Sequence, residues 1–201
     1  MNSMSVSKKM ICLLLLLLAM FSVGESKAQK VAIKTNVVYD AAANVNAGLE
    51  FGLARRWTLD VSGNLNVWDM SQGRKWKHWL AQPELRYWLC DRFAGHFFAL
   101  HLHGGQYNVG GIENGLRFLG TDFSKLGDNR FQGWFAGAGI AYGYTWILGK
   151  HWNLEAELGF GYSYTNYDTF ECAGCGKKVK EDDEHHYVGP TKAAINLVYL
   201  F

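Results

Sequence analysis

The sequence has few prolines, no long hydrophobic run after its first 28 residues and no motif typical of a catalytic site. Only two prolines occur among the 201 residues. No later apolar run reaches the roughly 20 residues that a membrane-spanning helix needs. If this chain spans a membrane, strands must do so, because a closed barrel satisfies every backbone hydrogen bond between neighbouring strands.

The first 28 residues have the pattern of a secretory signal peptide. Lys8 and Lys9 precede an apolar run from Met10 to Phe21, and the small residues Ser26 and Ala28 follow it. A basic start, a short apolar core and small residues two apart are typical of a cleaved leader. We expect cleavage after Ala28, which leaves residues 29–201 as one domain. A retained anchor is the alternative.

Removal of that leader makes the chain neutral. The full chain has 20 basic and 18 acidic residues. Lys8, Lys9, Lys27 and Glu25 lie in the leader, so seventeen of each sign remain. No basic surplus is left to attract nucleic acid. The sequence therefore predicts no nucleic-acid partner.

What the sequence does contain is 23 glycines, 15% aromatic residues and long stretches of period-two alternation. In residues 152–165 and 134–146, large apolar side chains alternate with small or polar ones. Successive side chains of a strand point to opposite faces, so each segment has one apolar face. Six further segments follow the same rule less regularly: 31–40, 49–53, 57–67, 79–89, 98–103 and 195–201. The prediction is an all-β protein, an eight-stranded antiparallel up-and-down transmembrane β-barrel.

The connections between these strands alternate in length. Residues 54–56, 91–95 and 149–151 form short turns. On the other side we expect loops at 41–46, 69–78, 108–131 and 167–188. Short turns at one end and long loops at the other are typical of bacterial outer-membrane barrels, whose short turns are periplasmic.

The apolar faces can point to lipid or into a soluble barrel. A soluble barrel would have to expose apolar rows such as Leu154–Phe160 to water, or place the whole set of charged residues in a dry core. A membrane barrel places them in its interior, where charges of mixed sign pair. We therefore predict the outer membrane as the location, and a polar network in the lumen. Its expected members are Lys34, Asp40, Glu50, Asp60, Glu84, Arg86, His101, His103, Glu155, Glu157 and Lys192.

Aromatic residues gather at the predicted strand ends. Trp57, Phe93 and Trp152 lie towards the short turns. Those expected near the long loops are Trp68, Trp76, Trp79, Trp134, Tyr162 and Tyr164. Rings of tryptophan and tyrosine are typical of membrane interfaces.

Five segments together resemble the DUF3575 family of Bacteroidetes. They are KTNVVYDAA, NAGLEFGLARRWTLDVSGN, KWKHWLAQPELRYWLC, HFFALHLHGGQYNVGG and GPTKAAINLVYLF. The resemblance extends over nearly all of residues 29–201. The family has no established activity, its members resemble small outer-membrane barrels, and some are encoded beside fimbrial genes. The resemblance therefore implies a barrel with a role around surface fimbriae.

Two cysteines in the last predicted loop allow two interpretations. Cys172 and Cys175, with His185 and His186, offer four potential zinc ligands. The adjacent histidines are poorly spaced for that geometry, and an exported loop is oxidising, which favours a local disulfide. Cys90 lies near the opposite end of the barrel and is expected to be a free thiol. We predict no metal and no cofactor.

His101 and His103 lie on one face of a strand, with carboxylates on other strands. They could form a metal or acid–base site, but no local motif supplies a nucleophile. Membership of the lumen network is the preferred interpretation.

The function predicted from sequence is therefore a structural or interaction barrel rather than an enzyme. Its expected partners are outer-membrane lipid, lipopolysaccharide near residues 74–78, and a fimbrial or other surface protein bound by loops 108–131 and 167–188. A small channel is the first alternative, although eight strands leave little interior space. A lipid-modifying enzyme is the second.

Overall fold

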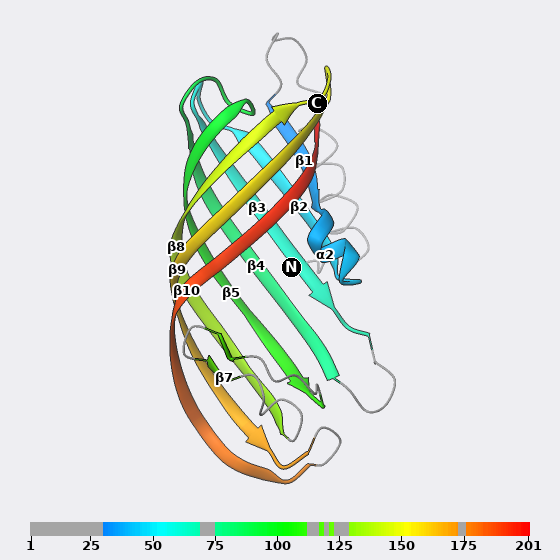
Figure 1. Ribbon diagram of the computed structural model, residues 1–201, viewed down its shortest axis with the longest axis vertical. Coiled ribbons are helices and arrows are strands. Elements are labelled where there is room, and N and C mark those ends of the chain that lie inside the picture. The colour runs from blue at the N-terminus through cyan, green and yellow to red at the C-terminus, as the bar shows by residue number, and fades with distance from the viewer. Residues whose placement is uncertain (1–29, 69–74, 112–116, 119–120, 123–128, 173–175) are drawn as a thin grey trace, which may run out of the picture.

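The computed structural model describes residues 30–68, 75–111, 117–118, 121–122, 129–172 and 176–201. Eight strands close into an antiparallel barrel in which each strand pairs with its neighbours along the chain (Figure 1). They are β1 (Val31–Asn36), β2 (Val45–Gly52), β3 (Trp57–Asn66), β4 (Lys75–Trp88), β5 (Gly95–Gly110), β8 (Arg130–Ile147), β9 (Trp152–Phe170) and β10 (Lys178–Leu200). The predicted number, direction and order of strands are confirmed.

A short helix and a two-stranded sheet are not part of the eight-stranded ring. The five-residue helix α2 (Val37–Ala41) follows β1 directly. The strands β6 (Arg117–Phe118) and β7 (Thr121–Asp122) pair with each other between β5 and β8. No helix of the described residues has the length and apolar character needed to cross a membrane. The predicted leader, residues 1–28, lies outside the described residues and stays a prediction.

The strands are strongly staggered. Following the paired residues from Val31 through β2 around the ring leads to Pro190 on β10, whereas Val31 itself lies beside Phe201, eleven residues further along. Such a shear accompanies strands that tilt by about 35–45° from the barrel axis. Side chains from alternate positions therefore meet in the interior at several levels.

The side chains sort by face as the alternation predicts. Glu84 and Arg86 on β4 are buried, whereas Leu85 between them is exposed. The same holds on β9, where Glu155 and Glu157 are buried and Leu158 is exposed. The barrel thus has a polar interior and an apolar outer surface.

The first strand is shorter than predicted. Asn36 ends β1 and caps α2, because its side-chain oxygen accepts a hydrogen bond from the Val38 N–H at 3.1 Å. The expectation that Asp40 lines the interior is wrong, since Asp40 lies on α2 and is exposed. It accepts hydrogen bonds from Thr35 Oγ1 (2.8 Å) and Asn46 Nδ2 (2.6 Å) instead, and so fixes α2 to β1 and β2.

The strands at the other end are longer than predicted. β9 reaches Phe170 and β10 begins at Lys178, so most of the expected loop 167–188 is strand. The expected loop 69–78 is likewise shortened, because β4 begins at Lys75. Apart from Val179 and Val188, both faces of these extensions are polar or aromatic, so no period-two hydrophobic signal marks them in the sequence.

Glycines make room in the narrow interior. A Cβ on Gly139 would lie 2.5 Å from the Phe160 carbonyl oxygen and 2.7 Å from His101 Nε2. A Cβ on Gly149, in the turn between β8 and β9, would have nothing within 4 Å.

We therefore expect Gly139→Ala to lower the free energy of unfolding by about 1–3 kcal/mol, as overpacking does elsewhere. Gly149→Ala is the matched control and should leave it near the wild-type value. Urea unfolding followed by tryptophan fluorescence measures both. Equal midpoints for the two variants would contradict this expectation, because they would mean that a Cβ at Gly139 fits without a clash.

Candidate functional site

The barrel interior contains a cluster of eight charged side chains around one guanidinium group. Its members are Lys34, Glu50, Asp60, Glu84, Arg86, Glu155, Glu157 and Lys192, all buried and supplied by β1, β2, β3, β4, β9 and β10. We call this set the lumen network. The structure thus brings together eight of the eleven residues assigned to the lumen from sequence.

Arg86 lies at the centre of the network. Its Nε donates to Glu84 at 2.5 Å, and its Nη1 donates to Glu50 (3.0 Å) and Glu155 (2.9 Å). Its Nη2 donates to Glu157 at 2.7 Å and lies 3.2 Å from Asp60. One guanidinium therefore contacts all five carboxylates, because its planar fork directs five N–H groups outward.

Two lysines complete the ion pairs. Lys34 Nζ contacts Glu50 and lies 2.7 Å from Asp60 and 3.5 Å from Glu155. Lys192 Nζ lies 2.7 Å from Glu84 and 3.1 Å from Glu157. Desolvated charges are stable only when paired and hydrogen-bonded in this way.

The network also has partners that the sequence analysis did not name. Thr58 donates to Glu50, and Trp88 Nε1 donates to Thr58 Oγ1 at 2.9 Å. Asn196 Nδ2 and Thr145 Oγ1 donate to Glu155 at 2.8 Å and 3.2 Å. Each of these residues is at an inward position of its strand, so alternation alone could have identified them.

Aromatic rings close the interior on the short-turn side of the network. Phe97 lies under Arg86, with the guanidinium carbon 4.4 Å from the ring centre, and packs 4.7 Å from Trp88. Phe93 also packs on Trp88 and is buried. Its expected place in the outer aromatic ring is therefore wrong, and its φ of 65° accompanies a turn that directs the ring inward.

The five carboxylates outnumber the three cations of the lumen network. Glu157 Oε1 and Asp60 Oδ1 have no hydrogen-bond partner among the described residues. The buried cluster therefore has a formal excess of two negative charges when every group is ionised. Loss of one carboxylate charge should be tolerated far better than loss of the central cation.

His101 and His103 face the interior beside the network without an ion pair among the described residues. His101 Nε2 lies 2.9 Å from Thr191 Oγ1, and the two imidazole rings are 5.7 Å apart. Neither Nδ1 has a hydrogen-bond partner in the described part of the chain. No group of three or more metal-binding side chains occurs there either.

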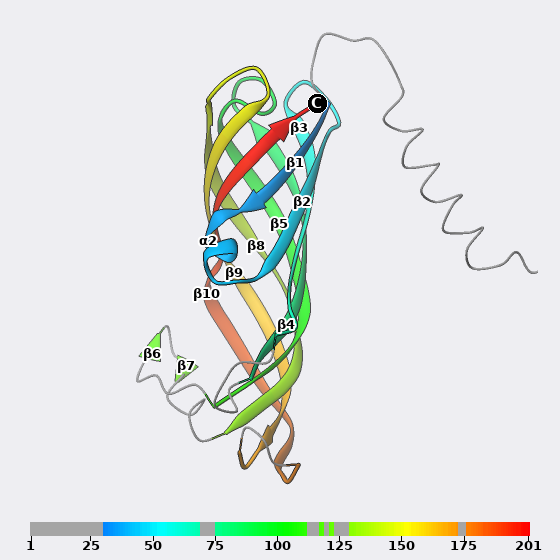
Figure 2. The same ribbon diagram turned by 90° about the vertical axis from the view of Figure 1, so that its right-hand side faces the viewer.

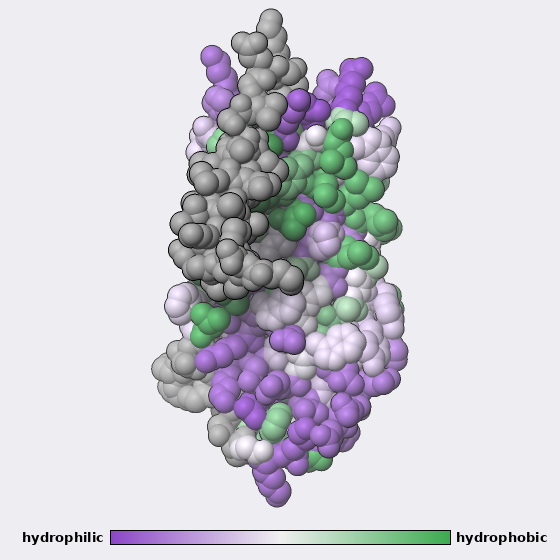
Figure 3. Space-filling view, turned by 180° about the vertical axis from the view of Figure 1, so that it is seen from behind, coloured by the Kyte–Doolittle hydropathy of each residue, from purple (hydrophilic) through white to green (hydrophobic). Residues whose placement is uncertain are grey.

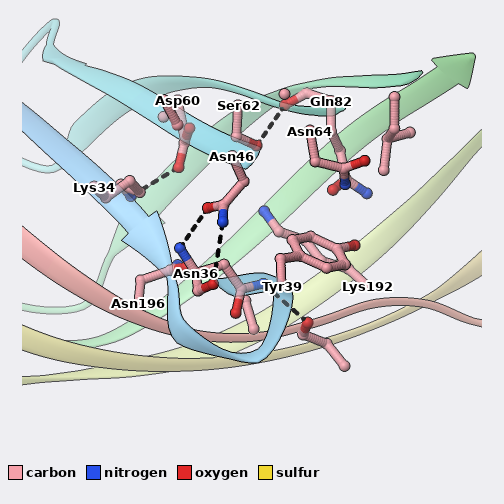
Figure 4. Close-up of a pocket in the computed structure, with 16 residues that line it drawn as sticks. Lys34, Asn36, Tyr39, Asn46, Asp60, Ser62, Asn64, Gln82, Lys192 and Asn196 are labelled. Atoms are coloured by element: carbon pink, nitrogen blue, oxygen red, sulfur yellow. Dashed lines mark hydrogen bonds and ion pairs between the residues drawn. The ribbon is translucent and has the colours of Figure 1, made fainter. Parts of the chain in front are cut away.

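A small polar cavity of about 30 Å³ lies between the network and α2 (Figure 4). Lys34, Asn36, Tyr39, Asp60 and Lys192 are among the residues that line it. Its volume suits one water or two.

The β9–β10 end of the barrel is predominantly acidic. From Asp168 to Glu184 the chain has six acidic and three basic residues. Lys178 donates to Glu181 at 2.8 Å and lies 2.9 Å from Asp168. These contacts raise the pKa of Lys178, and the hydrogen bond from Lys178 lowers the pKa of Asp168.

The cysteines are only partly within the described residues. Cys172 is disulfide-bonded, whereas its expected partner Cys175 lies outside the described residues, so that pairing stays a prediction. Cys90 is a free, exposed thiol, as expected. His185 and His186 lie on β10, where His186 Nδ1 is 2.6 Å from the Tyr162 hydroxyl.

We expect Arg86→Met to lower the free energy of unfolding by about 3–5 kcal/mol, because it leaves buried carboxylates without their common partner. Glu157→Gln should change the free energy of unfolding much less, because Lys192 and Arg86 still pair with Glu84. Arg55→Met removes an exposed ion pair with Asp91 and is the surface control. Urea midpoints of the three variants measure the effect. A Glu157→Gln variant as unstable as Arg86→Met would contradict the charge excess.

A second expectation concerns the thiols of residues 29–201, which include Cys90, Cys172 and Cys175. Without reductant, a maleimide should label one thiol per chain, and Cys90→Ser should abolish that labelling. After reduction and denaturation three thiols should react. The zinc interpretation would be favoured if the folded chain bound one zinc and if three thiols reacted after denaturation without reductant.

No curated protein and no solved structure matches the chain. The model of a family described as "Protein of unknown function (DUF3575)" matches residues 11–201. The match covers nearly the whole chain, in agreement with the resemblance seen in its sequence, and the chain therefore belongs to the DUF3575 family.

Proposed function

We propose that this protein is a small β-barrel of the bacterial outer membrane, with a closed lumen and a structural or interaction role. The observation that carries the proposal is the reversed distribution of its side chains, charged inside and apolar outside. A water-soluble barrel of this kind would expose its apolar strand faces to solvent. Lipid is the surrounding that stabilises such a surface.

The apolar outer surface forms a continuous zone, which we call the belt. Exposed aliphatic residues on neighbouring strands make it up: Leu49, Val61, Leu85, Leu100, Leu102, Ile140, Leu158 and Ile195. Figure 3 shows hydrophobic side chains between hydrophilic ends on one face of the molecule. A belt bounded in this way supports insertion across a bilayer.

Aromatic side chains border the belt on both sides. Trp57, Trp146 and Trp152 are exposed near the short turns. Trp79 and Trp134 are exposed towards the other end. Rings at two levels match the interfacial girdles of membrane barrels, with the short turns in the periplasm.

The filled lumen favours an interaction role over a channel. Arg86 and its five carboxylates occupy the cross-section, and Trp88 and Phe97 pack beneath them. An eight-stranded barrel has little interior beyond its own side chains. Function is then expected at the end that projects beyond the belt, where β9 and β10 are longest.

The proposed partner is a protein at the cell surface. The projecting end carries polar and acidic side chains, which suit contact with water and another protein. The family resemblance adds fimbrial proteins as a partner class.

A lysine in the centre of the belt tests the membrane proposal. Leu100 is 58% exposed and pairs with Leu85 and Ile140 on its two sides. In lipid vesicles, Leu100→Lys should lower the free energy of unfolding by about 2–4 kcal/mol, because the ammonium lies in hydrocarbon. Leu148→Lys, at a position that is 61% exposed and lies at the barrel end, is the matched control and should cost about 1 kcal/mol or less.

The same samples give a second measurement. A folded membrane barrel should migrate differently on a gel before and after boiling. An unchanged stability of Leu100→Lys, or a chain that stays soluble and folded without detergent, would reject the membrane proposal.

A further inference from the structure

The barrel wall is incomplete on one side of β10. β10 pairs with β9 from Lys178 to Tyr199, but with β1 only from Asn196 to Leu200. Beyond Asn196, β1 gives way to α2, while β10 continues towards the projecting end (Figure 2). A long edge of β10 therefore has no neighbouring strand among the described residues.

The part of this edge nearest β1 is satisfied by side chains. The Asn36 amide accepts from the Ile195 N–H at 3.3 Å and donates to the Ala193 carbonyl at 3.4 Å. Pro190 has no N–H, and the Tyr187 hydroxyl donates to its carbonyl at 3.2 Å. Side chains thus satisfy the Ile195 N–H and the Ala193 and Pro190 carbonyls where the edge crosses the belt, and lipid would penalise such groups if they lacked partners.

The register of β10 identifies which of its backbone N–H and C=O groups face away from β9 nearer the projecting end. The Leu200 N–H donates to His151 on the β9 side, whereas the Phe201 N–H donates to Val31 on the β1 side. Odd-numbered residues of this part of β10 therefore face the β1 side. The one-residue bulge between Pro190 and Lys192 inverts that parity.

Before the bulge, the even-numbered residues Glu184, His186 and Val188 direct their N–H and C=O groups away from β9. The stretch Asp183–Pro190 pairs regularly with Tyr167–Phe160. It is therefore a regularly paired template whose outer edge has no neighbouring strand among the described residues, and Tyr162 and Tyr164 flank His186 within it.

We propose that the edge of β10 at Glu184–Val188 binds an extended, cationic segment of another protein by strand addition. Backbone hydrogen bonds supply the affinity in this mode of recognition, and side chains supply selectivity. The proposal rests on the membrane orientation given above and specifies the class of partner.

The acidic side chains near this edge favour a cationic segment as the partner. Asp182 and Glu184 are exposed beside the edge, and the lysines nearby are already paired: Lys178 with Asp168 and Glu181, and Lys180 with Asp183 at 3.4 Å. The six acidic and three basic residues of Asp168–Glu184 leave a net charge of minus three. Basic side chains on the added strand would face this surplus.

Strand geometry excludes a second copy of the barrel as the occupant. Two copies in one membrane are related by an axis along the membrane normal. Strands tilted by about 35–45° would then cross at roughly 70–90°, whereas paired strands twist by only about 20–25°. The occupant must therefore be a segment whose direction the membrane does not fix.

The test uses the full barrel folded in detergent and a fluorescent nine-residue peptide of alternating lysine and valine. Wild type should bind this peptide, and binding should weaken as salt rises. His186→Pro removes one edge N–H that β9 does not use, and proline is tolerated on such an edge. This variant should fold but lose about tenfold in affinity or more, equivalent to about 1.4 kcal/mol.

Two controls make the result specific. His186→Ala keeps the N–H and should bind within about twofold of wild type, since only a side chain changes. A peptide of alternating glutamate and valine should bind at least about tenfold more weakly than its lysine counterpart. Tyr187→Pro, whose N–H faces β9, should fail to fold and so checks the assigned parity.

The outcomes separate this inference from the membrane proposal. A folded, heat-modifiable wild-type barrel that does not bind the lysine peptide, or binds both peptides equally, overturns strand addition alone. Equal binding by His186→Pro and wild type also overturns it. A chain that shows neither heat-modifiable migration nor sensitivity to Leu100→Lys overturns the membrane proposal on which it rests.

Discussion

The fold depends on how one buried guanidinium is satisfied. Arg86 on β4 meets carboxylates from β2, β3, β9 and its own strand, and those carboxylates meet lysines from β1 and β10. A slip of one residue in any of these strands would turn a charged side chain to the outside and an apolar one inward. The ion pairs and the apolar belt are therefore two consequences of a single register.

The narrow interior adds a requirement for shape. His101 lies against Gly139 and Gly159, and His103 against Gly137, so wide rings on β5 face strands without side chains. Aromatic residues fill the short-turn end, and charges fill the middle. The barrel interior thus consists of layers that differ in chemistry, and buried charged side chains occupy the level of Arg86.

Sequence alone predicted those parts of the fold in which one face of a strand is apolar. The alternation in 134–146 and 152–165 identified β8 and β9, and inward parity selected eight charges that do meet. Prediction from alternation failed where the two faces of a segment do not differ in hydrophobicity. Asp40 continued the pattern of β1 in sequence, but the Asn36 cap begins a helix there.

The projecting strands were missed for a related reason. The sequence predicts a loop at His185 and His186 because no hydrophobic face marks β10 before Val188. Phe93 was placed outside because alternation cannot foresee a turn with positive φ. The pairing of Cys172 with Cys175 depends on loop conformation, about which strand periodicity says nothing.

The unequal lengths of β1 and β10 connect stability with function. A complete wall would have been more stable, so a strand that stops after six residues beside one of twenty-three needs compensation. Asn36 and Pro190 supply it within the belt, where, in the proposed membrane orientation, an unpaired backbone group would be most costly. Outside the belt, water can solvate the open edge until another strand replaces it. The two ends of β10 therefore differ: one closes the barrel against β1, and the other has no neighbouring strand among the described residues, which is where we propose that a partner pairs.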